Sequence, residues 1–168
     1  MHYSPAMPVP DRITGCTCAR LRKLTRRITQ HYDVRLAPAG LRVTQFSLLA
    51  TLYHGGPAKL SALAGTMEMD RTTLTRNLKP LADAGFVAVA AGDDARERLV
   101  TATERGRRAW LAARGEWRRA QDEVNRALGV GKVAALHELL DESLARLHTA
   151  RAGDSAAPAR RRGRRRPK

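Results

Sequence analysis

Aromatic side chains make up only 4% of this 168-residue chain. A core with so few rings must be built from Leu, Val, Ala, Ile and Met, which favours helices over an all-β sandwich. The hydrophobic fraction of 43% is ordinary for a globular protein, so the chain is not disordered throughout. The length fits one compact domain or a modest two-part fold.

Long apolar runs and cysteines are also scarce. No run approaches the ~20 residues of a membrane-spanning helix, and residues 1–10 hold no signal-peptide core. The two cysteines are too few for a disulfide scaffold. We therefore expect a cytoplasmic protein with no membrane partner.

Sequence signatures of catalysis and of metal binding are missing too. The chain has no nucleophile elbow, phosphate-binding loop, HExxH motif or paired-carboxylate arrangement. Its histidines are scattered, and no Cys/His cluster has a zinc-like spacing. We expect no enzymatic activity, no cofactor and no metal.

Positive charge, by contrast, is abundant, with 31 basic against 16 acidic residues and a net charge of +15. The segment 151–168 contributes +7, so residues 1–150 still carry +8. A basic folded part most often meets nucleic acid and less often an anionic membrane.

The spacing of apolar residues predicts a mainly α fold with one small β-hairpin. Thr44 is the expected N-cap of the second helix, and Asp70 that of the fourth. Apolar stripes on the long helices, including Trp110 and Trp117, need a cover, for which we expect the same helices of a second copy. The expected helices span about 13–36, 45–53, 60–67, 71–83, 104–126 and 132–149, and the expected strands 86–90 and 98–102.

These elements suggest a division of the chain by role. The segment 41–103, a helix–break–helix followed by a hairpin, is typical of a winged helix-turn-helix DNA-binding domain. Residues 12–40 and 104–149 would form a helical dimerisation region. Residues 1–11 would be a flexible N-terminus, and residues 150–168 a disordered basic tail.

The fourth predicted helix has one apolar and one polar face. At 100° per residue, its leucines define a buried side, and the opposite side carries Thr72, Arg76, Lys79 and Asp83, flanked by Thr73 and Thr75. In a major groove, Arg can pair with guanine, and Thr can reach a base edge, a thymine methyl or a phosphate. An ordinary solvated face is the alternative, although such faces usually carry long Glu and Lys side chains.

The tip of the hairpin supplies a second candidate contact. Arg96 is a long planar cation that could enter a narrow minor groove, with Asp94 orienting its guanidinium. A surface salt bridge of little energetic value is the alternative.

Three segments of the chain carry a family resemblance in order: Leu41–Leu49, Met69–Leu78, and Asp94-x-Arg96 followed by Leu99-Val100 and Gly106. They resemble the MarR family of bacterial transcriptional regulators, and the resemblance covers about residues 13–149. It implies a homodimer of winged-helix subunits on a pseudo-palindromic operator, released by a small ligand or an oxidant. The DNA-binding residues are then expected to be Arg71, Thr72, Thr73, Thr75, Arg76, Lys79, Asp94 and Arg96.

The sequence departs from the family pattern at two places. Glu68 stands where the family often has Gly, so the turn could differ there. The stretch 101–103 replaces the commoner Leu-Thr at the end of the second strand.

Cys16 and Cys18 resemble in position the sensing cysteine of the hydroperoxide-sensing branch of that family. A helix N-terminus and the nearby Arg20 and Arg22 favour the thiolate form, and Cys18 is the better match by its spacing to Leu21. That branch has aromatic hydroxyls near its cysteine, whereas Arg22 stands here. Small apolar fillers at a dimer interface are the alternative interpretation.

The dense arginine run from residue 160 to 166 would add sequence-independent attraction to phosphate or act as a passive solubilising tail. It keeps a second function open, that of a nonspecific architectural DNA-binding protein.

Overall fold

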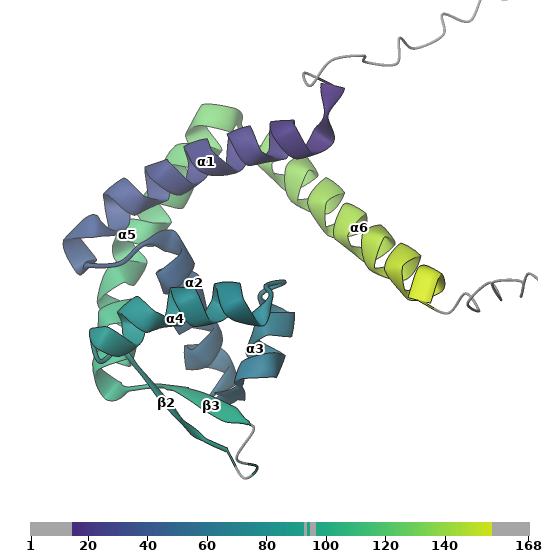
Figure 1. The fold of residues 1–168 in the computed structure, drawn as a ribbon. Coiled ribbons are helices and arrows are strands. Elements are labelled where there is room, and N and C mark those ends of the chain that lie inside the picture. Colours follow the sequence, from purple (N-terminus) through teal and green to yellow (C-terminus); the bar gives the residue numbers. More distant parts are fainter. Residues whose placement is uncertain (1–14, 93, 95–96, 156–168) are drawn as a thin grey trace, which may run out of the picture. The chain divides into compact units, whose positions relative to one another are not determined.

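The computed structural model describes residues 15–92, 94 and 97–155, for residues 151–155 in backbone only. These residues are mostly helical and carry a small antiparallel sheet, which confirms the predicted fold class (Figure 1). They form two compact units, divided between Glu123 and Val124, and each unit is described by itself.

The first unit contains a helix-turn-helix flanked by a three-stranded sheet and two longer helices. The strands lie in the order β1-β3-β2, and Val89 of β2 faces Val100 of β3 in antiparallel register. In chain order the elements are α1 (Thr17–Leu36), η2 (Ala37–Ala39), α2 (Val43–Gly55), β1 (Ala58–Lys59), α3 (Leu60–Thr66), α4 (Arg71–Asp83), β2 (Val87–Ala91), β3 (Arg98–Ala102) and α5 (Glu104–Leu128), which continues into the second unit.

An aromatic stack joins α2 to α5. The ring of Phe46 stacks against both Trp110 and Trp117, with ring centroids 5.8 Å apart in each pair. The apolar stripe predicted on α5 is therefore covered at both tryptophans by Phe46 of α2 in the same chain. Our expectation of a second copy as their cover was wrong, because heptad spacing shows that a stripe is apolar but not which helix covers it.

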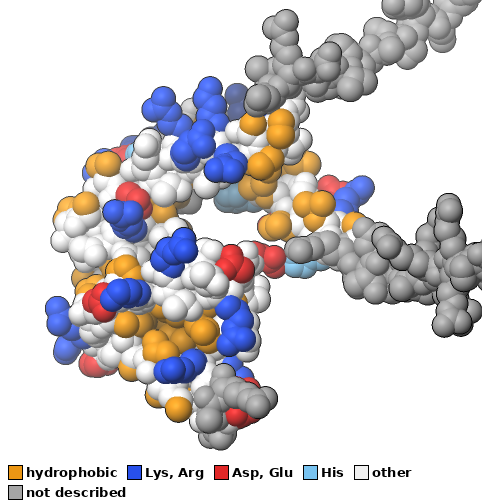
Figure 2. All heavy atoms as spheres, viewed as in Figure 1, with side chains coloured by type: hydrophobic (Ala, Val, Ile, Leu, Met, Phe, Trp, Pro, Cys, Tyr) orange, Lys and Arg blue, Asp and Glu red, His pale blue; other side chains and the backbone are white. Residues whose placement is uncertain are grey.

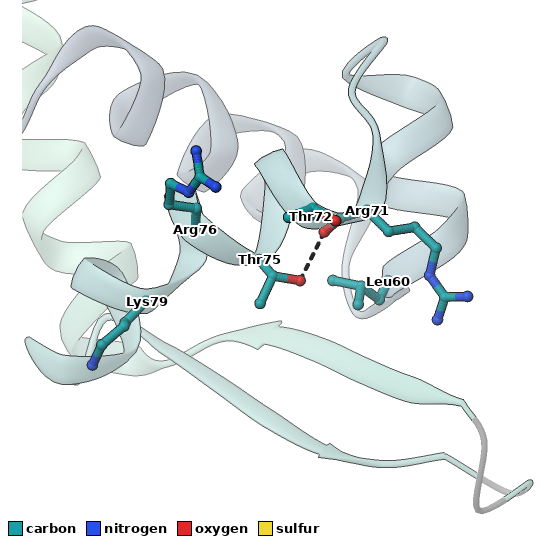
Figure 3. Close-up of a pocket in the computed structure, with 6 residues that line it drawn as sticks. All are labelled: Leu60, Arg71, Thr72, Thr75, Arg76 and Lys79. Atoms are coloured by element: carbon teal, nitrogen blue, oxygen red, sulfur yellow. Dashed lines mark hydrogen bonds between the residues drawn. The ribbon is translucent and has the colours of Figure 1, made fainter.

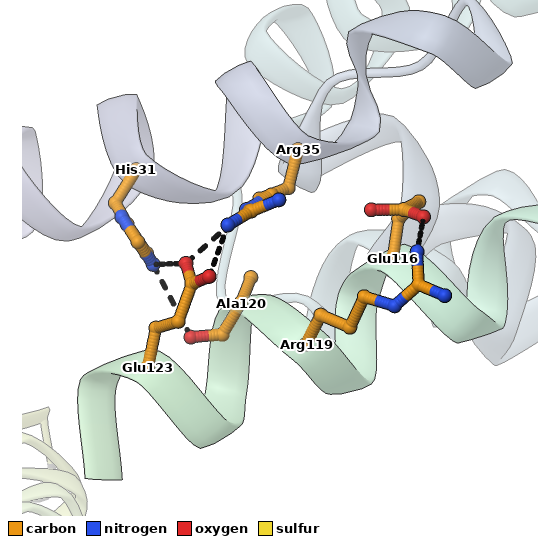
Figure 4. A network of polar contacts seen from close by, with 6 residues as sticks. All are labelled: His31, Arg35, Glu116, Arg119, Ala120 and Glu123. Atoms are coloured by element: carbon orange, nitrogen blue, oxygen red, sulfur yellow. Dashed lines mark hydrogen bonds and ion pairs between the residues drawn. The ribbon is translucent and has the colours of Figure 1, made fainter. Parts of the chain in front are cut away.

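A polar network joins α1 to α5 (Figure 4). The Arg35 guanidinium forms two hydrogen bonds with the Glu123 carboxylate, and His31 Nε2 lies 3.1 Å from the same carboxylate. Next to it, the Tyr32 hydroxyl donates a hydrogen bond to Gln121, and burial raises the pKa of Tyr32. These contacts tie the last turns of α1 to the C-terminal third of α5.

Hydrogen bonds of Thr103 hold the junction between β3 and α5. The Thr103 hydroxyl donates to the Gly85 carbonyl at 2.7 Å and accepts from the Gly106 N–H at 3.0 Å, which makes Thr103 the N-cap of α5. Although residues 101–103 depart from the family pattern, Thr103 still caps the helix that follows.

Several boundaries differ from those predicted. α2 begins at Val43 with Arg42 as its N-cap, not Thr44, because the Gln45 side chain accepts from the Arg42 N–H and Asp33 accepts from the Val43 N–H. The short β1 and the 3₁₀ turn η2 were not predicted, since two or three residues carry no periodicity.

The second unit consists of the end of α5 and α6 (Val130–Ser155). α6 runs through Ser155, further than the predicted end at residue 149, and residues 156–168 of the predicted tail lie outside the described residues. Val133 is buried, whereas Leu139, Leu144 and Leu147 are exposed. No helix in the part of the chain that the structure describes is long and apolar enough to cross a membrane.

Candidate nucleic-acid interface

The turn between α3 and α4 positions α4, the second helix of the helix-turn-helix. Glu68 has a φ of +53°, the left-handed conformation that glycine adopts without strain. The turn therefore keeps the backbone conformation of a glycine despite the substitution noted in the sequence. A non-glycine residue there costs about 1 kcal/mol or more in backbone strain.

Asp70 is the N-cap of α4, as predicted. Its carboxylate accepts from the Thr73 N–H at 2.8 Å and from the Thr73 hydroxyl at 2.6 Å. The hydroxyl bond, and next to it the backbone bond, lower the pKa of Asp70. The Thr73 hydroxyl is thus engaged in the cap, although Thr73 remains exposed.

The two faces of α4 are those that the periodicity predicts. Leu74, Leu78 and Leu81 are all at most 3% exposed and form the buried side. The polar positions on the other side are all exposed: Arg71, Thr72, Thr73, Thr75, Arg76, Lys79 and Asp83.

The exposed side of α4 borders a hollow of about 460 Å³ (Figure 3). Five of its six lining residues are predicted DNA contacts, namely Arg71, Thr72, Thr75, Arg76 and Lys79. The sixth is Leu60, the first residue of α3, which was not among the DNA contacts predicted from the sequence. Its half-buried position depends on how α3 meets α4, and single-helix periodicity does not contain that information.

Two polar side chains of this surface already have partners. The Thr75 hydroxyl donates to the Arg71 carbonyl at 2.8 Å, one turn earlier in the helix. Lys79 pairs with Asp83 at 2.9 Å, and both side chains are well exposed. Such an exposed pair is weak and can be exchanged for a phosphate at little cost.

The base of the wing, which is the hairpin of β2 and β3, lies beside the start of α3. Lys59 of β1 pairs with Glu97 at 2.8 Å, and both line a second hollow of about 220 Å³ together with Leu60, Arg71 and Arg98. The exposed Arg98, the first residue of β3, was not among the predicted contacts, because strand alternation puts it on the same face as the buried Val100. It adds a cation next to those of α4.

The predicted pair at the wing tip is only partly visible. The Asp94 carbonyl accepts from the Glu97 N–H at 2.8 Å, whereas Arg96 lies outside the described residues. Its predicted role in a minor groove stays a prediction.

The two cysteines lie where the sequence predicts, at the start of α1. Cys16 is the N-cap residue, Cys18 is in the first turn, and both are exposed. Among the residues described, no group of three or more His, Cys, Asp or Glu side chains is placed to hold a metal ion.

The space-filling view shows how charge surrounds the α4 surface (Figure 2). Lysine and arginine side chains lie around α4 and toward the hairpin, and hydrophobic side chains are gathered between them. A cationic rim around a partly apolar hollow fits a polyanion that also offers apolar groups, such as duplex DNA.

Comparison with known proteins identifies relatives of this chain. The sequence model of the MarR family matches residues 41–97. HTH-type transcriptional regulator YwoH of Bacillus subtilis strain 168 is 31% identical over 85 residues, which are 51% of this chain and 62% of that relative. The match therefore spans less than two thirds of the curated relative's length.

Solved structures extend the similarity beyond the matched domain. The M. tuberculosis transcriptional regulator MosR, solved in complex with DNA, is 37% identical with a TM-score of 0.64, covering 76% of this chain and 98% of MosR. A MarR mutant from E. coli, complexed with operator DNA, shares the fold with a TM-score of 0.67 at 22% identity, covering 74% of this chain and 91% of that one.

Proposed function

Because the chain belongs to the MarR family of transcriptional regulators, we propose that it binds double-stranded DNA as a homodimer and represses transcription from a pseudo-palindromic operator in the cytoplasm. The observation that carries this proposal is the exposed face of α4. Five predicted contacts from one helix line a single hollow, rimmed by three cations. That placement suits a recognition helix inserted into a major groove.

The 37% identical MosR gives the proposal its second support, since it was solved with DNA and this chain covers 98% of it. Within the interface, Arg76 is suited to bidentate pairing with guanine, and Thr72 offers a hydroxyl to a base edge or phosphate. Lys79 would leave Asp83 for a phosphate.

A second copy is needed for a palindromic site. The exposed leucines of α1, Leu21 and Leu24, and of α6, Leu144 and Leu147, are apolar surface available to a partner. Sedimentation equilibrium at micromolar concentration should show a dimer. A fully helical monomer would contradict this part of the proposal.

Selection of bound duplexes from random DNA tests the function as a whole. A regulator should enrich one inverted repeat, with half-sites ~34–36 Å apart, and prefer it by ~10³-fold or more over bulk DNA. Arg76→Ala should lose that preference, and Arg119→Ala on the α5 surface is a matched control that should retain it. An architectural DNA-binding protein, the alternative function, would show no preferred sequence.

Release of DNA would follow from an effector. A hollow of about 630 Å³ lies between the end of α1 and the start of α2, with Asp33, Leu41 and Arg42 in its lining. We propose that it accepts a small ligand, because it combines a cation, an acceptor and apolar surface next to the joint of α1 with the DNA-binding elements. Screening ligands for release of the selected operator tests this, and Arg42→Ala should weaken the response to an anionic ligand.

An oxidant acting at the exposed cysteines is the second route of release that we propose. A charged or bulky product in the first turn of α1 would disturb a helix that Arg35 and Tyr32 tie to α5. Such a disturbance would change the spacing of the two recognition helices.

A further inference from the structure

Leu60 gives the α4 surface an apolar component that the function proposed above does not use. It lines the same hollow as Arg71, Thr72, Thr75, Arg76 and Lys79, and it is half-buried, so part of its side chain meets solvent. An apolar side chain inside a rim of three cations is out of place for binding phosphate alone.

Thr75 adds a second apolar group beside it. Its hydroxyl donates to the Arg71 carbonyl at 2.8 Å. Figure 3 shows the branched end of Leu60 directed toward Thr75, whose bonded oxygen is turned toward the start of α4 and the side of Leu60. The methyl carbon of Thr75 is turned away from that oxygen, so the two apolar groups lie on either side of the bonded hydroxyl. With its hydroxyl satisfied inside the helix, Thr75 presents a methyl group rather than a hydrogen-bond donor.

The chemistry of the major groove leaves one match for this pair. Base edges there present donors and acceptors, and the C5-methyl of thymine is their apolar group. The surrounding cations favour a polyanion over an apolar protein segment, because Arg71 and Arg76 would lose hydration against an apolar partner.

We infer that Leu60 and the Thr75 methyl form a thymine-methyl pocket, which selects thymine at one position of each DNA half-site. The inference rests on the proposed function and adds the base that this part of the surface recognises. It also assigns a specificity-determining role to Leu60, which lies on α3 rather than on the recognition helix.

Deoxyuridine tests the inference because it differs from thymidine only by the missing methyl. Starting from the duplex selected from random DNA, each thymine is replaced by uracil in turn, symmetrically in both half-sites, and affinity is measured at fixed salt. Burial of one methyl is worth about fourfold in affinity. We therefore expect one position at which the double replacement weakens binding by about 16-fold.

Matched variants connect that loss to the two residues. Leu60→Ala should bind the thymine duplex more weakly and lose most of the uracil penalty, whereas Leu60→Met should keep it. Thr75→Ser, which keeps the hydroxyl, should reduce the penalty, and Thr75→Val, which keeps the methyl, should retain it. Circular dichroism confirms that each variant is folded.

The possible outcomes separate the inference from the function. If an operator is found and Arg76→Ala loses it, but no uracil position matters, the inference is wrong and the function stands. The same holds if Leu60→Ala keeps the full uracil penalty. If no sequence is preferred at all, the proposed function itself fails.

Discussion

Gly106, in the first turn of α5, lies so close to the backbone of Phe86 that there is no room for a side chain. A Cβ at this position would lie 2.0 Å from the Phe86 carbonyl oxygen, 2.8 Å from its carbon and 3.1 Å from the Phe86 Cα. All three neighbours are backbone atoms, so no side chain can rotate to relieve the contact. Gly106→Ala must therefore displace the start of α5 from the beginning of the hairpin.

The loss of stability follows from the packing and hydrogen bonds that this displacement would disturb. Overpacking of this kind costs about 1–3 kcal/mol. The Phe86 carbonyl also accepts from the Thr103 N–H at 3.0 Å and from the Thr103 hydroxyl at 3.2 Å, and each weakened bond adds about 1 kcal/mol. We expect Gly106→Ala to lower the free energy of unfolding by about 3–5 kcal/mol, a large part of a typical stability of ~5–15 kcal/mol.

Gly115 is a matched control on the same helix. It is exposed, and a Cβ there would meet nothing within 4 Å. Gly115→Ala should raise stability by about 0.5–1 kcal/mol, because alanine loses less chain entropy in a helix. Urea unfolding followed at 222 nm, at one protein concentration for all variants, measures both changes. If Gly106→Ala is as stable as the parent, the described contact between Phe86 and α5 is wrong.

Three further predictions concern the turn, the cap and the cysteines. Glu68→Gly should be more stable than Glu68→Ala by about 1 kcal/mol, because only glycine relieves the positive φ; equal urea midpoints would contradict this. Since the Asp70 pKa is lowered by folding, its carboxylate stabilises the fold above its ordinary pKa of about 4, and that contribution is lost as the pH falls below it. The stability difference between the parent and Asp70→Asn should therefore shrink from pH 6 to pH 3, and a constant difference would refute the cap. If the oxidant route operates, peroxide releases operator DNA from the parent but not from Cys18→Ser, whereas identical responses would make the thiols packing residues.

The elements whose signal is local were predicted well. The buried face of α4, its cap at Asp70 and the two strands of the wing follow from periodicity and capping chemistry within a few residues. These features can be predicted from one segment alone, because the period of a helix or a strand determines which of its side chains share a face.

The elements that depend on contact between segments were not predicted. Phe46 covers the tryptophan seam of α5 through a pairing of helices far apart in sequence. Leu60 enters the α4 surface for the same reason, since the α3–α4 turn decides what it meets. The sequence shows that both residues are apolar, but it does not show which residues they contact.

The hydrogen bonds of the threonines change how the recognition surface can distinguish bases. Sequence alone offered three threonine hydroxyls, but that of Thr73 is engaged by Asp70 and that of Thr75 by the Arg71 carbonyl. Reading by hydrogen bonds then falls to Arg76 and Thr72, and Thr75 contributes through its methyl. Because a bidentate arginine contact distinguishes bases by ~1–3 kcal/mol and a methyl contact by about 0.8 kcal/mol, a half-site should depend most on one guanine and less on one thymine.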